Sequence, residues 1–250
     1  MRVIDVHAHW GRFPMPMGEI TLAGMLRVMD ANQIERIVVS SIEAILYDMT
    51  FGNSAVADIV RQSPRVFGYI FLSPNRVAES FEDLDRYAND PRFVGVKMYS
   101  GAYIGQALNC PAHRQFLERI AARFPRLAIL FHCGENDPNN YPGILELARL
   151  FFFFGFVVGC VGLVFWPQVF VVVWWVPNLC LEICAPVPAR PRTEDAVKAV
   201  GADRVLFGSD YPIINPAYML GSVLGADISD ADRRRILYDN AARLLPFPPT

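Results

Sequence analysis

Eight short runs of β-branched and other apolar residues recur along the chain, and most of them are separated by stretches with helical spacing. Such alternation is typical of an α/β fold in which helices cover a parallel sheet. The predicted strands cover residues 3–7, 36–40, 66–72, 93–98, 127–132, 156–160, 179–183 and 204–208. The predicted helices cover residues 22–32, 54–62, 78–89, 112–124, 142–150, 167–176, 193–200 and 230–245.

Two architectures fit this alternation: an open doubly wound sheet and a closed barrel. Polar residues follow the first, fifth and eighth predicted strands. In a closed barrel these carboxyl ends meet at one rim, whereas an open sheet would separate them. No Gly/Ser-rich linker divides the 250 residues. We therefore predict a single-domain α/β protein, a TIM-like (β/α)8 barrel that spans residues 1–250.

Composition narrows the class of protein further. The formal net charge is −2 and no basic stripe is present, so we expect no nucleic-acid partner. The five cysteines lack C-x-x-C spacing, which indicates reduced thiols rather than a disulfide framework. The sequence passes from Met1-Arg2 directly into a predicted strand. We therefore expect neither a signal peptide nor a transit peptide and predict a cytoplasmic protein.

The strongest local signal is the stretch Asp5-Val6-His7-Ala8-His9. Residues two apart on a strand point to the same side, so His7 and His9 project next to each other. Two imidazoles on one rigid strand form half of a metal site. An ordinary hydrogen-bonded pair is the alternative, but the chain has only four histidines, and two of them share this spacing.

Two further polar residues end predicted strands at the same rim. His132 follows four apolar residues and precedes a loop, and Asp210 follows the apolar end of the eighth strand. A core or capping role is the alternative for each of them. In a barrel, however, the eighth strand lies beside the first, which would place Asp210 opposite His7 and His9.

Three neutral imidazoles and one carboxylate suit a single divalent metal with one position left open for water. We expect Zn²⁺ first, with Mn²⁺ or Fe²⁺ as alternatives. Such a metal lowers the pKa of its bound water toward ~7 and so supplies a hydroxide at neutral pH. Asp210, which would touch both metal and water, is the candidate catalytic residue that takes a proton and returns it to a leaving group.

Four motifs in this order carry a resemblance to a known family: His7-Ala8-His9, His132-Cys133-Gly134-Glu135, Gly208-Ser209-Asp210-Tyr211-Pro212 and Asn240-Ala241-Ala242-Arg243-Leu244. From residue 3 to residue 245, the chain resembles the amidohydrolase superfamily. More narrowly, it is similar to the amidohydrolase-related (amidohydrolase 2) branch, which includes aminocarboxymuconate-semialdehyde and resorcylate decarboxylases. The resemblance implies a (β/α)8 barrel, one metal held by His7, His9, His132 and Asp210, and either hydrolysis or non-oxidative decarboxylation of a small carboxylated substrate.

One position departs from this pattern. Members of the branch usually have a histidine at the end of the sixth strand, where this chain has Cys160. A thiol with a pKa near ~8.5 binds metals or acts as a nucleophile, but it replaces an imidazole poorly as an acid or base. Cys160 is therefore a candidate catalytic residue, and a small buried cysteine without a role is the equal alternative.

Cys160 lies within an unusually apolar segment, residues 150–176, which contains no charged side chain. About 20 apolar residues suffice to span a membrane, but Pro167 and three glycines interrupt this segment, so we expect no membrane contact. Three explanations fit: a hydrophobic oligomer interface, deliberate engineering, or residue identities that differ from those of the natural gene. We hypothesise that the natural protein has His at position 160 and a charged helix after Pro167, which an intact mass would test.

Several other residues are candidates for the substrate site. Lys97 ends the fourth strand and is predicted to contact a substrate carboxylate, with a bridging role between two metals or a structural ion pair as alternatives. Tyr99 and Glu135 are further candidates for substrate binding, with packing and solvated loop polarity as their alternatives. Glu182 is predicted to point into the barrel or to cap its rim. His113 opens an outer helix and is expected to face solvent.

These observations predict a metal-dependent hydrolase that acts on a small carboxylate-bearing ester, lactone or amide through a metal-activated water. A decarboxylase that uses the same ligands is the alternative within enzymes. An inactive barrel or interaction protein is the alternative from another class, suggested by Cys160 and the apolar segment. We expect a small-molecule substrate and allow for a homo-oligomer, while the loops carry no motif that identifies the substrate.

Overall fold

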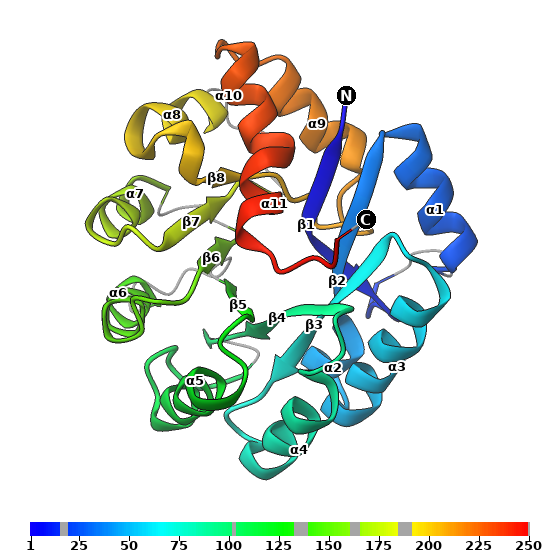
Figure 1. The fold of residues 1–250 in the computed structure, drawn as a ribbon, viewed down its shortest axis with the longest axis vertical. Coiled ribbons are helices and arrows are strands. Elements are labelled where there is room, and N and C mark those ends of the chain that lie inside the picture. Colours follow the sequence, from blue (N-terminus) through cyan, green and yellow to red (C-terminus); the bar gives the residue numbers. More distant parts are fainter. Residues whose placement is uncertain (16–19, 102–103, 133–139, 161–165, 185–191, 250) are drawn as a thin grey trace.

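The computed structural model describes residues 1–15, 20–101, 104–132, 140–160, 166–184 and 192–249. Eight parallel strands follow one another around a single barrel in the order of the sequence (Figure 1). They are β1 (Val3–Trp10), β2 (Ile34–Ser41), β3 (Val66–Leu72), β4 (Phe93–Met98), β5 (Ala128–His132), β6 (Phe156–Gly159), β7 (Leu179–Glu182) and β8 (Val205–Leu206). The predicted fold class is confirmed, and each predicted strand overlaps an observed one.

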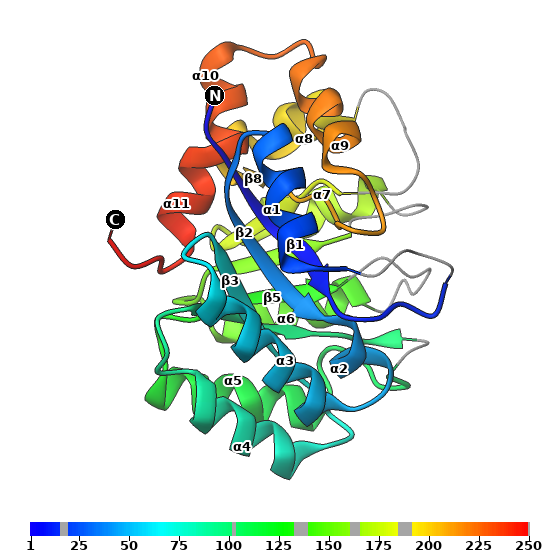
Figure 2. The same cartoon turned by 90° about the vertical axis from the view of Figure 1, so that its right-hand side faces the viewer.

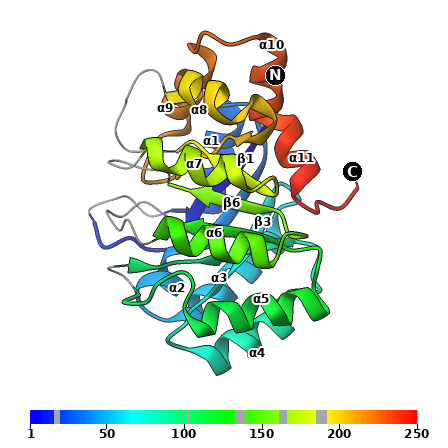
Figure 3. The ribbon, with the colours of Figure 1, turned by 90° about the vertical axis from the view of Figure 1, so that its left-hand side faces the viewer.

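Helices cover the outside of the barrel (Figures 1 and 3). They are α1 (Leu22–Ala31), α2 (Ile42–Leu46), α3 (Met49–Gln62), α4 (Val77–Tyr87), α5 (Pro111–Arg123), α6 (Asn140–Leu150), α7 (Trp166–Trp175), α8 (Arg192–Val200), α9 (Pro216–Leu224), α10 (Asp230–Arg234) and α11 (Asn240–Leu244). A 3-10 turn, η2 (Ala202–Arg204), precedes β8, and a π-helical turn, η3 (Arg235–Asp239), joins α10 to α11. The helices α2 and α9 were not predicted. Each begins at a side chain that caps it, Ser41 and Asn215 respectively.

The strand β8 is short because the chain leaves β7 after Leu206 and continues along β1. The backbone N–H of Val6 donates to Phe207 O at 3.1 Å, and the N–H of Asp210 donates to His7 O at 2.7 Å. These bonds join the first and last strands, so the residues that follow β8 lie beside β1 at the carboxyl rim.

The two ends of the barrel differ. Figure 2 shows α11 and both termini on one side and the carboxyl ends of the strands on the other. The barrel interior near α11 is apolar, and Ala241 and Leu245 pack there against strand residues such as Val6 and Leu206. Asn240, from the fourth motif, donates to Ala202 O at 2.7 Å and Val205 O at 2.8 Å. This motif therefore closes the amino-terminal end of the barrel, and chemistry is left to the opposite rim.

The apolar segment 150–176 contributes to α6, β6 and α7 without forming one continuous element. Its strand β6 is fully buried, but Phe152, Phe153, Trp174 and Trp175 are more than half exposed on the outer surface. Figure 3 shows α6 and α7 next to each other on this surface. In the part of the chain that the structure describes, no helix combines the length and the hydropathy needed to cross a membrane.

The expected solvent exposure of His113 is wrong. It lies on the buried face of α5 and is completely buried, and Nδ1 donates to Leu108 O at 3.1 Å. Burial lowers the pKa of His113 to about 4, so the ring is neutral at physiological pH. The carbonyl of Leu108, in the turn before α5, accepts a hydrogen bond from this ring, which explains why an imidazole is tolerated in a buried position. Sequence periodicity does not reveal such a partner.

Candidate metal centre

The two histidines of β1 lie side by side at the carboxyl rim. Both are 1 % exposed, and their ring centroids are 5.3 Å apart. Between Asp5 and Ala8, β1 advances three residues, while its partner strand β2 advances only two, from Ile37 to Val39. The pairing register therefore shifts beside His7. Shifts of this kind re-aim side chains and are common next to functional sites.

Asp210 reaches the two histidines from the other side of the closure between β8 and β1. Its backbone is in the left-handed region, with φ +60°, which turns the side chain toward β1. Oδ1 lies 3.0 Å from His9 Nε2 and 3.9 Å from His7 Nε2. Burial raises the pKa of Asp210, but the contact with His9 and the nearby charges outweigh it, so the pKa lies below its ordinary value. The side chain is therefore a carboxylate.

His7, His9 and Asp210 fit a divalent metal. Their ligand atoms all lie within 4.8 Å of one another. Burial, followed by the charge of Lys97, lowers the pKa of both imidazoles, which keeps them neutral as metal ligands must be. Asp210 Oδ1 is buried and accepts no well-aligned hydrogen bond from a described residue. Two imidazole nitrogens together with this carboxylate oxygen suit Zn²⁺, Mn²⁺ or Fe²⁺.

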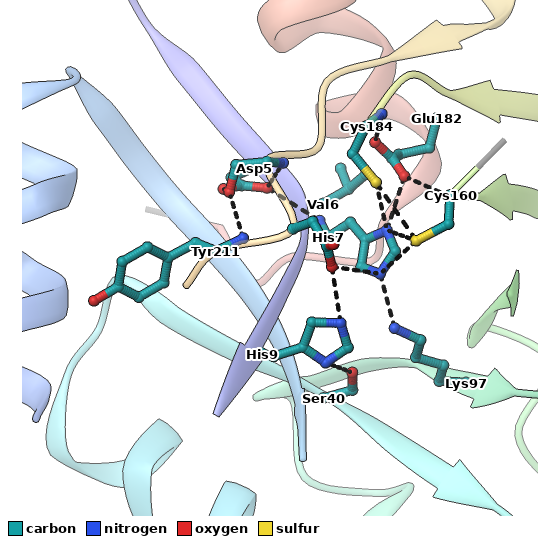
Figure 4. A network of polar contacts seen from close by, with 12 residues as sticks. Asp5, Val6, His7, His9, Ser40, Lys97, Cys160, Glu182, Cys184 and Tyr211 are labelled. Carbon is teal, nitrogen blue, oxygen red and sulfur yellow. Dashed lines mark hydrogen bonds and ion pairs between the residues drawn. The ribbon is translucent and has the colours of Figure 1, made fainter. Parts of the chain in front are cut away.

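Glu182 fixes the orientation of His7 (Figure 4). The carboxylate Oε2 lies 2.8 Å from His7 Nδ1, and Lys97 Nζ lies 2.8 Å from Nε2. A neutral ring that donates from Nδ1 to Glu182 leaves the Nε2 lone pair facing the cluster. Burial raises the pKa of Glu182 to about 7. A Cβ at Gly208 would collide with this carboxylate, which explains the glycine of the third motif.

Asp5 holds the two chain segments of the site together. Oδ1 accepts the backbone N–H of His7 at 3.1 Å and that of Ser209 at 3.0 Å. Oδ2 accepts the Ser209 hydroxyl, whose oxygen in turn accepts the N–H of Tyr211 at 3.0 Å. Figure 4 shows Asp5 on the far side of β1 from the imidazoles. It therefore fixes the strand and the turn that carry the ligands without pointing into the site.

Lys97 is fully buried and faces the same cluster. Burial lowers its pKa, and no described carboxylate forms an ion pair with it. The structural ion pair considered from the sequence is therefore absent from the described residues. Nζ also lies 5.2 Å from the ring centroid of Tyr99, the residue predicted to line the substrate site.

His132 ends β5 as predicted, but its ligand atoms do not lie within 4.8 Å of the whole His7, His9 and Asp210 group. Its ring stacks on Tyr99 with centroids 3.9 Å apart and an interplanar angle of 7°. Burial, followed by the charge of Lys97, holds its pKa well below the ordinary value. Nδ1 is buried and has no hydrogen-bond partner among the described residues. His132 therefore remains a predicted fourth ligand, while Glu135 lies outside the described residues.

Cys160 lies immediately after β6 with φ +55°, and its Sγ is 3.9 Å from both ring nitrogens of His7. Sequence analysis did not single out Cys184, whose Sγ lies 3.4 Å from His7 Nδ1 and 3.6 Å from Cys160 Sγ. The i, i+2 spacing of Glu182 and Cys184 at the end of β7 was the available signal, because it places both side chains on one face.

Known families and solved structures resemble this chain along nearly its whole length. The amidohydrolase family matches residues 4–247. Similar solved structures include dihydroxybenzoic acid decarboxylase from Polaromonas sp. JS666 with bound manganese and the inhibitor 2-nitroresorcinol. That structure has 17% identity, covers 97% of this chain and 96% of its own, and gives a TM-score of 0.77.

Two further decarboxylases are similar at full length. For 5-carboxyvanillate decarboxylase from Sphingomonas paucimobilis, identity is 14%, coverage is 99% of each chain and the TM-score is 0.76. For 2,6-dihydroxybenzoate decarboxylase from Rhizobium, identity is 18%, coverage is 97% of this chain and 98% of that chain, and the TM-score is 0.74. No curated protein matches the sequence.

At such low identities the structural likeness shows the fold alone. The family match is independent of it and extends over almost the whole chain, from β1 to the segment after α11. The chain therefore belongs to the amidohydrolase superfamily, in its amidohydrolase-related branch, and is an enzyme of that family.

Proposed function

We propose that the protein is a metal-dependent, non-oxidative decarboxylase of a small aromatic or muconate-like carboxylic acid. Sequence reasoning placed hydrolysis first and decarboxylation second. The similar structures described as decarboxylases of hydroxylated benzoic acids, matched over 97–99% of this chain, favour the second reaction. They support the choice between two reactions that the same group of ligands accommodates.

The observation that carries the proposal is the buried amine of Lys97. It faces His7 at 2.8 Å, and no described carboxylate pairs with it. An ammonium without a counterion is costly to bury, and a substrate carboxylate would supply the missing charge. Tyr99 lies beside this amine, with its ring centroid 5.2 Å from Nζ, and the edge of its ring would pack against the remainder of a small, planar acid.

The reaction balances without an oxidant. The bond between the carboxyl carbon and its neighbour breaks, CO₂ leaves, and a proton takes its place on the carbon that remains. His7, His9 and Asp210, with His132 as predicted fourth ligand, would hold a divalent metal, which would supply positive charge to offset the charge of the transition state. Lys97 would hold the carboxylate. Asp210 would take a proton from solvent on the oxygen that does not bind the metal and pass it to the carbon that loses CO₂. Glu182 keeps the His7 lone pair available.

The test measures CO₂ release by chelator-stripped protein reloaded with Mn²⁺ or Zn²⁺, with 2,6-dihydroxybenzoate and 5-carboxyvanillate as probes. Parallel assays use 4-nitrophenyl acetate and dihydrocoumarin as ester and lactone. We expect metal-dependent CO₂ release and no comparable ester or lactone turnover. Turnover of the ester or lactone without CO₂ release would overturn the proposal in favour of hydrolysis.

A matched pair of lysine variants sharpens this test. Lys97→Met removes the buried amine, and we expect kcat/KM for CO₂ release to fall by about 10²-fold, mainly through KM, because a charge-assisted contact is lost. The chain has one other lysine, Lys198, which is exposed on α8. Lys198→Met should leave both constants unchanged. An unaffected KM in Lys97→Met would remove its assigned role.

A further inference from the structure

Two thiols outside the ligand group described above lie next to each other at the ends of β6 and β7. The Sγ atoms of Cys160 and Cys184 are 3.6 Å apart, and they lie 3.9 Å and 3.4 Å from Nδ1 of His7, respectively. Figure 4 shows both sulfurs on the Glu182 side of the His7 ring, away from His9. The three ligand atoms lie within 4.8 Å of one another and form a second cluster, which shares only His7 with the His7, His9 and Asp210 group.

These distances match the edges of a tetrahedral thiolate–imidazole site. With Zn–S of about 2.3 Å and Zn–N of about 2.0–2.1 Å, tetrahedral geometry places two sulfurs about 3.8 Å apart and a sulfur and a nitrogen about 3.6 Å apart. Each of the three observed separations lies within about 0.3 Å of these values. One sulfur pair and one nitrogen are therefore already spaced for a shared ion.

Glu182 holds this arrangement in place. Its Oε2 accepts the backbone N–H of Cys160 at 3.2 Å, and its Oε1 accepts the backbone N–H of Cys184. The same Oε2 contacts His7 Nδ1 at 2.8 Å. One buried carboxylate thus contacts all three residues and holds them in place.

We propose that His7 Nδ1, Cys160 Sγ and Cys184 Sγ form a second metal position, which takes a thiophilic divalent cation such as Zn²⁺ or Cd²⁺. Binding replaces the two thiol protons, which pass to solvent, and no electron is transferred. Soft thiolate ligands select such ions over Mn²⁺, which prefers oxygen and nitrogen.

The two metal positions compete for His7. A neutral imidazole carries one proton, so a metal on Nδ1 moves that proton to Nε2. Nε2 can then no longer donate its lone pair to the ion shared with His9 and Asp210. A thiophilic ion in the second position therefore weakens Mn²⁺ binding in the first. This part of the inference rests on the metal centre of the proposed function.

The test is spectroscopic and uses the full chain, stripped with chelator and kept under phosphine reductant so that no disulfide forms. Co²⁺ or Cd²⁺ alone is titrated in, and the thiolate-to-metal charge-transfer absorption is recorded. We expect the band in the wild type, with at least tenfold weaker binding in Cys160→Ser and in Cys184→Ser. Cys110→Ser, outside the cluster, is the matched control and should keep the band. A wild type without the band, or serine variants that retain it, would overturn the proposal.

Two further measurements keep the test independent of variant folding and of activity. In the wild type, bound Cd²⁺ should protect half-buried Cys160 from alkylation, and equal labelling with and without Cd²⁺ would contradict the proposal. The resonance signal of free Mn²⁺ then reports the competition. Cd²⁺ should release Mn²⁺ from the wild type and not from the Cys160→Ser/Cys184→Ser double variant. A chain that never binds Mn²⁺ counts against the first site, whereas an absent charge-transfer band counts against the second.

Discussion

The seam between β8 and β1 and the sector formed by β6 and β7 supply opposite kinds of chemistry to one rim. At the seam, Asp210 brings a carboxylate oxygen to the two imidazoles, and Asp5 accepts the backbone N–H groups of His7 and Ser209. In the β6–β7 sector, the rim carries the thiols of Cys160 and Cys184. His7 lies between them with one nitrogen toward each. The rim thus places oxygen donors on one side of His7 and sulfur donors on the other. The neutral His7 ring has one free lone pair and can bind a metal on only one of these sides.

The outer surfaces of these two regions also differ in polarity. The helix α10 beyond the seam has no buried residue and contains an i, i+3 ion pair between Arg233 and Asp230. On α7, outside the β6–β7 sector, Trp174 and Trp175 are 65% and 62% exposed. The exterior of α7 is therefore apolar, whereas α10 has the charged exterior of an ordinary outer helix.

The largest expected effect comes from the seam. Asp210→Asn removes both a metal ligand and the group that carries the proton, so kcat for CO₂ release should fall about 10³-fold. Steady-state kinetics at saturating Mn²⁺ measure the change, and circular dichroism checks the fold. The exposed Asp203, changed to Asn, is the matched control and should be neutral. A kcat within a few-fold of wild type in Asp210→Asn would show that the seam does not carry the chemistry.

The next effect concerns stability. Asp5→Ala leaves two buried backbone N–H groups and the Ser209 hydroxyl without their acceptor, and we expect a loss of about 3 kcal/mol in the free energy of unfolding. Burial raises the pKa of Asp5 to about 7, so a neutral amide that keeps one acceptor oxygen should cost less. Urea unfolding of Asp5→Ala and Asp5→Asn measures both values. Equal losses would mean that the hydrogen bonds are not the reason this residue is needed.

Glu182 connects the two regions, and its effect should be intermediate. Glu182→Gln keeps the size of the side chain but weakens the contact that holds His7 in one tautomer. Partners of metal-ligating histidines typically contribute about 10- to 100-fold in metal affinity, and we expect a loss of Mn²⁺ affinity in that range by calorimetry. Glu146→Gln, at an exposed glutamate of α6, provides the control. An unchanged Mn²⁺ affinity would mean that the seam holds its metal without help from β7.

The sequence predicted the seam better than the sector. Strand periodicity and the His7-x-His9 spacing are local signals, and the closure of a barrel then brings Asp210 next to them. The role of Glu182 and the pairing of Cys160 with Cys184 depend on where β6 and β7 end within a residue or two. That detail comes from inter-strand register, which short apolar runs do not encode. The prediction that His113 is exposed was wrong for a related reason: its hydrogen-bond partner is a backbone carbonyl, which the side-chain pattern does not reveal.

The smallest energetic effect is expected on the outside of the sector. Replacing the exposed Trp174 and Trp175 with Lys removes no buried contact, so the free energy of unfolding should change by no more than about 0.5 kcal/mol. An exposed apolar surface of this kind marks an interaction site or an aggregation hazard, and the double variant should therefore be less associated in light scattering. Leu224→Lys, at an exposed leucine of α9, is the control. If the double variant associates as the wild type does, the apolar exterior is not an oligomer interface. The intact mass of the purified chain then tests whether its residues match those of the natural protein.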